Sequence, residues 1–329
     1  MTITNHPDTL HQSQQSTNDD LPVRIAWLYY MENLTQADIA ERLNMSRIKI
    51  TRYLKQARDK GIVQINIQSN NSSMLELEAA LSNRYNLKDV KVVMGVEPRQ
   101  SLQRLLAKGA SEWLVPRIES GITIGLGLSR TLSYMPEYFK PKRKIMCDFT
   151  DIIGGVTGPA SSMISLNITS QMAEICGGRP FRLLAPSVVS SKQAYETILS
   201  EPLLNEVFQK AHKCDILFQS CGGVDLDALL YEKKSLRAET LKFLSDNGAV
   251  GDILGHFMDI DGNPVKVPYD ELIISISLET LQKVHLGVLV AGGQEKVKTI
   301  HAAMKAKYFN VLITDESTAR EVLKISKMD

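Results

Sequence analysis

Cationic side chains gather in one short stretch of the sequence, where they could bind phosphate groups. Residues 46–60 hold six basic side chains and one acidic side chain, a local charge of +5. Ile50, Leu54 and Ala57 recur there at helical spacing, which predicts a helix with one apolar face and a cationic remainder. Such a helix can dock on a protein core and offer cations to the phosphates and base edges of DNA. A solvated surface helix is the alternative for a run of Lys and Arg.

The segments before this cationic helix supply the supports that a DNA-reading helix needs. Residues 23–33 predict a first helix, because apolar side chains recur there at helical spacing. Thr35 is placed to cap a second helix, and Asp38 in its first turn complements the helix dipole. The tight turn that follows contains Asn44, which tolerates left-handed backbone, and Ser46, a good N-cap for the cationic helix. The sequence therefore predicts a helix-turn-helix that binds DNA.

The candidate DNA-binding residues of this helix-turn-helix lie at the two helix starts and on the cationic face. They are Thr35, Ser46, Arg47, Lys49, Thr51, Arg52 and Lys55. Because the N-terminal part of a recognition helix enters the major groove, Arg47, Lys49, Thr51 and Arg52 are expected to contact DNA directly. Lys55 is expected to contact phosphate.

Glycines that directly follow apolar strands indicate a second kind of chemistry. In residues 125–131 (GLGLSRT) glycines end a predicted strand and hydroxyls begin a predicted helix, so that backbone N–H groups and hydroxyls could converge on an anion such as phosphate. The candidate residues are Gly125, Gly127, Ser129, Arg130 and Thr131. Arg130 could add a bidentate contact. Tight packing is the alternative explanation for these glycines.

Composition divides the chain into three parts. Residues 1–20 are polar and predict a disordered tail. Residues 21–68 hold the helix-turn-helix and close on an alternating strand pattern at 62–67, before a polar linker at 69–73. Residues 69–329 alternate helices with short apolar strands, which predicts an α/β domain with a doubly wound, mainly parallel sheet. Ligands of such sheets bind at the carboxyl ends of the strands.

The overall composition excludes several classes of protein. A net charge of +1 over 329 residues argues against a uniformly basic protein, and no apolar run has the length of about 18–20 residues that a membrane span needs. The four cysteines lack metal-ligand spacing and predict buried thiols, and no cofactor motif or nucleophile–histidine–carboxylate pattern is present, so we expect no metal, cofactor or catalytic residue. Trp27 and Trp113 are expected in the core.

The chain resembles the SorC family of bacterial sugar-responsive transcriptional regulators, which lie close to one branch of the DeoR regulators. The resemblance covers nearly everything after residue 20 and is carried by VRIAWLYYMENLTQADIAERLNMSRIKITRYLKQARDKGIVQI, ITIGLGLSRTL, NGAVGDILGHFMDIDGNPV, VLVAGGQEKVKTI and NVLITDESTAREVL. It implies an N-terminal winged helix-turn-helix and an effector domain similar in fold to sugar-phosphate isomerases and deaminases. It also implies a homotetramer, assembled as a dimer of dimers.

The resemblance implies further effector-binding residues. Asp252 matches a carboxylate that accepts hydrogen bonds from sugar hydroxyls, and Lys296 matches a cation that approaches the phosphate of the ligand. Residues expected to line the same crevice are Gly154, Gly155, Asn167, Gly222, Gly223, Gly292 and Gly293.

The leading hypothesis is therefore a DNA-binding transcriptional regulator of a carbohydrate or polyol catabolic operon. Its expected partners are a double-stranded DNA operator, a small phosphorylated sugar or polyol that modulates operator binding, and further copies of the same chain. We expect it in the bacterial cytoplasm, associated with the nucleoid through its operator and with no membrane partner. The alternative is a sugar-phosphate isomerase or deaminase with a basic N-terminal appendage, which rests on fold analogy alone.

Overall fold

The structure is a computed structural model that describes residues 21–63, 71–95, 99–155, 167–224, 238–266 and 272–325. The chain divides into two compact units, Met1–Ser69 and Asn70–Asp329. The predicted tail at 1–20 and most of the predicted strand at 62–67 lie outside the described residues.

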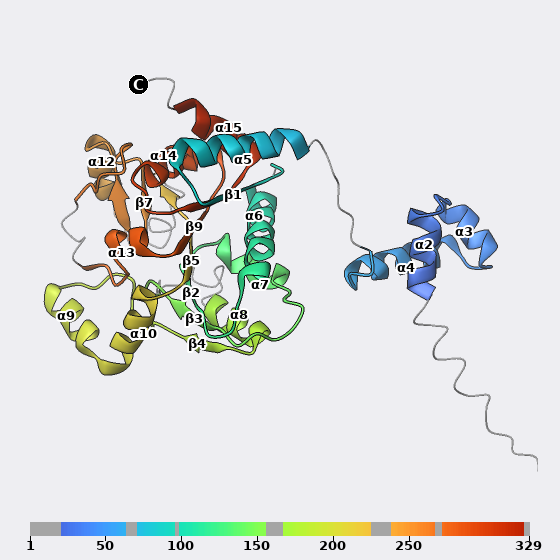
Figure 1. Cartoon of the computed structure of the whole chain (residues 1–329), viewed down its shortest axis with the longest axis horizontal. Coiled ribbons are helices and arrows are strands. Elements are labelled where there is room, and N and C mark those ends of the chain that lie inside the picture. The colour runs from blue at the N-terminus through green and yellow to red at the C-terminus, as the bar shows by residue number, and fades with distance from the viewer. Residues whose placement is uncertain are drawn as a thin grey trace, which may run out of the picture. The chain divides into compact units, whose positions relative to one another are not determined.

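The described part of the first unit, residues 21–63, contains the helices α2 (Leu21–Tyr30), α3 (Gln36–Arg42) and α4 (Arg47–Asp59) (Figure 1). Their shared core consists of one apolar side chain or two from each helix: Ile25, Leu28, Ile39, Ile50 and Leu54. The predicted apolar face of α4 is confirmed, since Ile50, Leu54 and Ala57 are all buried. This packing leaves the other sides of α4 in solvent.

The prediction that Trp27 belongs to the core is wrong. Its side chain is 57% exposed, whereas Trp113 in the second unit is only 4% exposed. Ile25 and Leu28 define the buried face of α2, and Trp27 falls between them in sequence but on another side of the helix.

The second unit begins with α5 (Asn71–Tyr85), so that part of the predicted linker at 69–73 is already helical. The elements that follow alternate between strands and helices as predicted. They are β1 (Asp89–Val93), α6 (Arg99–Leu114), η1 (Val115–Arg117), β2 (Thr123–Leu126), η2 (Leu132–Tyr134), α7 (Met135–Tyr138), β3 (Asp148–Asp151), α8 (Ile168–Cys176), β4 (Arg179–Phe181), α9 (Lys192–Ser200), α10 (Pro202–His212), β5 (Ile216–Gln219), β6 (Gly222–Gly223), α12 (Ala238–Asp246), β7 (Gly251–Ile253), β8 (His256–Met258), α13 (Leu278–Lys283), β9 (Leu286–Val290), η5 (Gln294–Lys296), α14 (Val297–Lys305), β10 (Val311–Asp315) and α15 (Glu316–Ile325).

Seven of these strands form one parallel sheet in the order β1-β10-β9-β5-β2-β3-β4. From β2 the chain adds β3 and β4 on one side, and it then crosses back to add β5, β9 and β10 on the other side. The direction of winding therefore changes between β2 and β5, which is the switch point where open α/β sheets place their ligands.

A smaller antiparallel sheet of β6, β7 and β8 accompanies the main sheet. The apolar run at residues 272–277 contributes only single bridge pairs, through Ile273 and Ser275. The apolar residues of this run do not form a regular strand, because the segments with which they pair are irregular.

Helices cover both faces of the main sheet, and strand residues alternate between two cores (Figure 1). Leu217 of β5 packs with side chains of α5, α14 and α15, whereas Ile216 and Phe218 pack with side chains of α6 and α8. Because strand side chains alternate, Gln219 belongs to the same face as Leu217.

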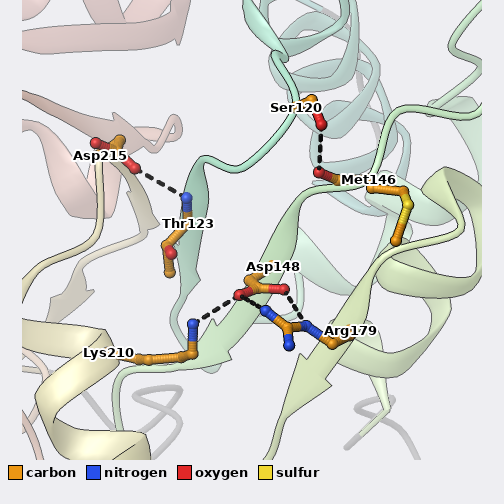
Figure 2. Close-up of polar contacts among 7 residues, drawn as sticks. All are labelled: Ser120, Thr123, Met146, Asp148, Arg179, Lys210 and Asp215. Carbon is orange, nitrogen blue, oxygen red and sulfur yellow. Dashed lines mark hydrogen bonds and ion pairs between the residues drawn. The ribbon is translucent and has the colours of Figure 1, made fainter.

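At the amino ends of the strands, a carboxylate ties three elements together (Figure 2). Asp148 at the start of β3 accepts hydrogen bonds from Arg179 Nε at 2.9 Å and from Lys210 Nζ at 2.6 Å, which join β4 and α10 to β3. Burial alone would raise the pKa of Asp148, but the bonds from Arg179 and Lys210 lower it overall. Asp215, just before β5, accepts a bond from Thr123 N at 2.8 Å and aligns β5 with β2.

Candidate functional site

A capping box begins α3. Asp38 N donates to Thr35 Oγ1 at 3.2 Å, and Thr35 N donates to Asp38 Oδ2 at 3.0 Å. The hydrogen bonds from Thr35 also lower the pKa of Asp38, because they favour its charged form. The predicted cap is confirmed, and the Thr35 hydroxyl is engaged within the protein.

The turn between α3 and α4 has the predicted backbone. Asn44 adopts φ of 49°, and Met45 N donates to Ala40 O at 2.8 Å. Ser46 then caps α4 by accepting a hydrogen bond from Lys49 N at 3.4 Å. Thr51 Oγ1 donates to Gln36 Oε1 at 2.8 Å, so α4 is also tied to the start of α3.

The cations of α4 lie on its exposed side, as a DNA-contacting face requires. Arg47, Lys49, Arg52 and Lys55 are all exposed. A hollow of about 610 Å³ adjoins the starts of α3 and α4. It is lined by Tyr29, Tyr30, Asn33, Leu34, Thr35, Gln36, Ala37 and Arg47.

Sequence reasoning missed one residue of this face. Ile48, between Arg47 and Lys49, is 82% exposed, which is unusual for a large aliphatic side chain. The sequence could have identified Ile48 as a candidate, because it lies near the N-terminus of a recognition helix and outside the apolar spacing of Ile50 and Leu54.

In the second unit, the segment after β2 lies at the switch point of the main sheet. Ser129 Oγ accepts a hydrogen bond from Leu132 N at 3.2 Å, and Thr131 is only 2% exposed. The expected helix is here a 3-10 turn, η2, followed by the four-residue α7. The Ser129 hydroxyl thus shapes the turn, and Arg130 is partly exposed beside it.

Gly127, directly after β2, lies against the side chain of Gln219, which the sequence analysis did not predict as part of the site. Its N–H donates to Phe218 O of β5 at 2.9 Å, and Gln219 Oε1 occupies the space that a Cβ on Gly127 would need. A side chain at this position would therefore displace the carboxamide of Gln219. The sequence signal was a polar residue at the end of the apolar strand ILFQ.

Asp252 and Lys296, which the resemblance implied, each contact the segment that follows β5. Asp252 pairs with Gly222 in the β6–β7 register, and its Oδ1 fills the space beside that glycine. Lys296 Nζ donates to Ser220 Oγ at 3.4 Å. We call Gly127, Gln219, Ser220, Asp252 and Lys296 the switch-point site.

The pKa of Asp252 is raised to about 6. Burial is the main cause, and the hydrogen bond from Gly255 N at 3.0 Å together with the charge of Lys296 offsets it in part. A carboxyl group with this pKa carries a charge that a ligand hydroxyl could stabilise by donating a hydrogen bond.

Other glycines expected to line the site through their backbones are engaged elsewhere. Gly154 N donates to Ile274 O and Gly155 N to Ala185 O, each at 2.8 Å. Gly293 N donates to Thr318 Oγ1 at 2.8 Å, and Asp315 fills the space beside Gly292. Close packing thus applies at Gly154 and Gly292, whereas Gly293 has φ of 109°, which favours glycine.

Asn167 belongs to a network at the carboxyl end of β3. Its Oδ1 accepts a hydrogen bond from Arg182 Nη1 at 2.9 Å, and Arg182 Nε donates to Asp151 Oδ2 at 2.9 Å. Thr169 also donates to Asp151. The network holds α8 against β3 and β4.

Within the described ranges, no group of three or more His, Cys, Asp or Glu side chains could hold a metal ion. The four cysteines are buried and free, as predicted. Over the same ranges, none of the helices is long and apolar enough to cross a membrane.

Two family models match the chain. The sugar-binding domain family (Sugar-bind) matches residues 69–324, and the winged helix-turn-helix DNA-binding family matches residues 32–64. The first match covers most of the second unit and the second covers α3, α4 and the turn between them.

Named relatives match along nearly the whole chain. The transcriptional regulator LsrR of Klebsiella pneumoniae is 31% identical over 312 residues, which cover 94% of each chain. The deoxyribonucleoside regulator of Bacillus subtilis is 28% identical and covers 92% of this chain and 97% of its own length.

Among solved structures, the full-length sorbitol operon regulator SorC from Klebsiella pneumoniae superimposes with a TM-score of 0.75. It is 26% identical and covers 93% of this chain and 99% of its own. These relatives are named as regulators, which favours that class over the sugar-phosphate isomerase or deaminase alternative. The chain belongs to the SorC/DeoR family of sugar-binding transcriptional regulators, with an N-terminal winged helix-turn-helix and a sugar-binding domain.

Proposed function

We propose that the protein regulates a carbohydrate or polyol catabolic operon and that a phosphorylated sugar or polyol, bound at the switch-point site, changes its affinity for the operator. The observation that carries this proposal is that Lys296 and Asp252 lie against neighbouring residues of the segment after β5, Lys296 at Ser220 and Asp252 at Gly222. Lys296 supplies a cation for phosphate, and Asp252 supplies an acceptor for hydroxyl groups. The names of two relatives, which refer to a sorbitol operon and to deoxyribonucleosides, support a sugar or polyol ligand.

In this proposal α4 is the recognition helix. Arg47, Lys49 and Arg52 contact the DNA, and Lys55 contacts phosphate, which the exposure of all four side chains supports. Thr35 and Ser46 act through the caps that fix the starts of α3 and α4. The protein acts in the cytoplasm, where its operator lies.

The proposal includes a homotetramer that presents paired recognition helices. Operator half-sites lie about one helical turn or its multiples apart, roughly 34–36 Å. A ligand that changes the arrangement of the subunits would alter the spacing of the recognition helices. A coupling free energy of about 1–3 kcal/mol suffices for a change in affinity of roughly 5- to 150-fold.

The test separates the two binding functions by mutation. An operator fragment is first selected from random duplex DNA with the wild-type protein, and an effector is identified from sugar and polyol phosphates by thermal shift. We expect Arg52→Ala to weaken operator binding by roughly 5- to 150-fold and to leave the calorimetric Kd of the effector unchanged. Lys296→Met should do the reverse.

Matched controls are Arg24→Ala on α2 and Lys298→Met on α14, both exposed cations outside the proposed contacts. Neither control should change its respective affinity by more than about twofold. Loss of both functions in both test variants would contradict this division between the units. A thermal-shift panel without any response to phosphorylated compounds would contradict the proposed effector class.

A further inference from the structure

Gln219 is a buried polar side chain whose acceptor has no hydrogen-bond partner. It ends β5 and is 5% exposed, and its Oε1 accepts no hydrogen bond within the described part of the chain. Leaving a buried carbonyl oxygen unpaired costs free energy that an apolar side chain of the same shape would avoid. A buried unpaired acceptor at this position therefore needs an explanation.

The position of Gln219 connects it with the switch-point site. Its Oε1 lies directly over Gly127 on β2, the strand on the other side of the switch point. Ser220, the next residue, accepts the hydrogen bond from Lys296 Nζ. The unpaired oxygen is thus one residue along the chain from the serine that holds the proposed phosphate-binding cation.

The groups around this place have complementary chemistry. Lys296 is a cation, whereas Asp252 in its charged form and Gln219 Oε1 can only accept hydrogen bonds. A ligand that satisfies all three must carry an anion together with donors for the two acceptors. A phosphate with several hydroxyl groups has this pattern.

We propose that Gln219 Oε1 accepts a hydrogen bond from a hydroxyl group of the effector and so determines which phosphorylated polyol or sugar the protein recognises. The inference rests on the proposed function, because it assigns the ligand of the same site. An effector with a hydroxyl at this point pairs the buried oxygen. An analogue that lacks the hydroxyl leaves the oxygen unpaired, which is the basis on which polar sites reject deoxy analogues.

The first test is the stability of the ligand-free protein. Gln219→Met keeps the length of the side chain and removes the unpaired oxygen, so its melting temperature should rise by roughly 2–4 °C. Gln219→Leu is made in parallel, so that a poor fit of the methionine side chain alone does not decide the result. Gln193→Met on α9, at an exposed glutamine, is the matched control and should melt with the wild type. A fall in melting temperature in both Gln219 variants would show that the carboxamide serves packing and would overturn the inference.

The second test is a hydroxyl scan by calorimetry. Probes are ribose 5-phosphate, glucitol 6-phosphate, fructose 6-phosphate, inorganic phosphate and the free sugars, followed by each monodeoxy derivative of the probe that binds best. One deoxy derivative should bind the wild type at least about tenfold more weakly than its parent, as the loss of one well-made hydrogen bond predicts. Gln219→Met should bind parent and derivative equally, while Gln193→Met keeps the preference.

The outcomes separate this inference from the proposed function. If the wild type binds phosphorylated probes and Gln219→Met retains both its affinity and its preference among deoxy derivatives, only the role of Gln219 is overturned. If the wild type binds none of the phosphorylated probes, the proposed effector class fails and the assignment of Gln219 falls with it.

Discussion

Asp252 shows how packing changes the chemistry of a single residue. Its carboxyl group is partly buried between Gly222 and the β7–β8 turn, and its pKa rises from 3.8 to about 6. Because the folded-state pKa lies above the unfolded one, ionisation of Asp252 opposes folding. This penalty is absent below pH about 4 and is fully present above pH about 6.

We therefore expect Asp252→Asn to stabilise the ligand-free protein at neutral and alkaline pH. The free energy of unfolding should increase by about 3 kcal/mol at pH 8, given that one pKa unit corresponds to 1.36 kcal/mol. Asparagine also keeps an acceptor for Gly255 N. Denaturant titrations from pH 4 to pH 8 measure the effect, which should disappear towards pH 4. An effect that is the same at every pH would contradict the raised pKa.

Asp261→Asn is a control for which the change in the free energy of unfolding should have the opposite sign. The hydrogen bond from Lys305 is the main cause that lowers the pKa of Asp261. Its charge therefore favours folding above the unfolded pKa, and this contribution is lost as pH falls. The variant should be less stable than the wild type at pH 8, and the difference should shrink in acid.

Ile48 is a residue whose exposure points to DNA instead of the core. At 82% exposure it contributes little to folding, but it lies between two cations at the start of the recognition helix. Apolar side chains in the major groove contact the methyl group of thymine. We expect Ile48→Ala to change stability by less than about 0.5 kcal/mol and to weaken operator binding.

Replacing each operator thymine in turn by uracil, which lacks the methyl group, locates the contact of Ile48. One such substitution should weaken wild-type binding and have no effect on Ile48→Ala. Val23→Ala on α2, also exposed, serves as the control. If every uracil substitution affects the wild type and Ile48→Ala alike, Ile48 does not read thymine.

At the scale of elements, α4 depends on side chains that do not belong to its body. Ser46 caps its first turn, and Gln36 from α3 accepts the hydrogen bond of Thr51. The apolar face of α4 fixes which side is buried, whereas these polar contacts fix where the helix starts. The position of the exposed cations of α4 therefore depends on both its apolar face and these polar contacts.

The cap at Ser46 can be separated from any direct contact with DNA. Ser46→Ala should destabilise α4 by about 1 kcal/mol, because Lys49 N loses the side-chain acceptor that it has in addition to Ser46 O. Ser46→Asp restores an acceptor and complements the helix dipole, but its charge repels phosphate. Hydrogen exchange of the α4 amides in the full chain should be faster in Ser46→Ala only, whereas Ser46→Asp should lose operator affinity. Unchanged exchange in Ser46→Ala would show that the cap is dispensable.

At the scale of the whole molecule, charge is divided unequally between the two units. Residues 21–68 carry a net charge of +4, residues 69–329 carry none, and the first 20 residues carry −3. The near-neutral total therefore conceals a cationic DNA-binding unit joined to a larger neutral one. Attraction to DNA resides in the small unit, and effector binding is proposed for the large one.

A homotetramer is the expected form of the molecule in solution. Sedimentation velocity should give about four times the chain mass of 36.7 kDa at micromolar concentration. Footprinting of the operator should then show protected half-sites at intervals of about 10 base pairs or its multiples. A monomer at all concentrations would rule out paired docking of recognition helices.

The sequence by itself determined the local features of this protein. The caps at Thr35 and Ser46, the left-handed Asn44, the apolar face of α4 and the alternation of strands and helices all follow from short-range physics. Hydrogen bonds to the nearest N–H groups and the burial of one helix face depend on neighbours within about four residues. A pattern of residue types can therefore reveal them.

The tertiary structure decided which distant residues meet. Gln219 lies over Gly127 because the sheet order places β5 beside β2, and Lys296 reaches Ser220 because the same order places β9 on the other side of β5. The exposure of Trp27 and Ile48 likewise depends on which sides of α2 and α4 the other helices cover. Such contacts join residues that are far apart in sequence. The order of strands that creates them minimises the exposed apolar surface of the whole domain. A local sequence pattern does not record that order.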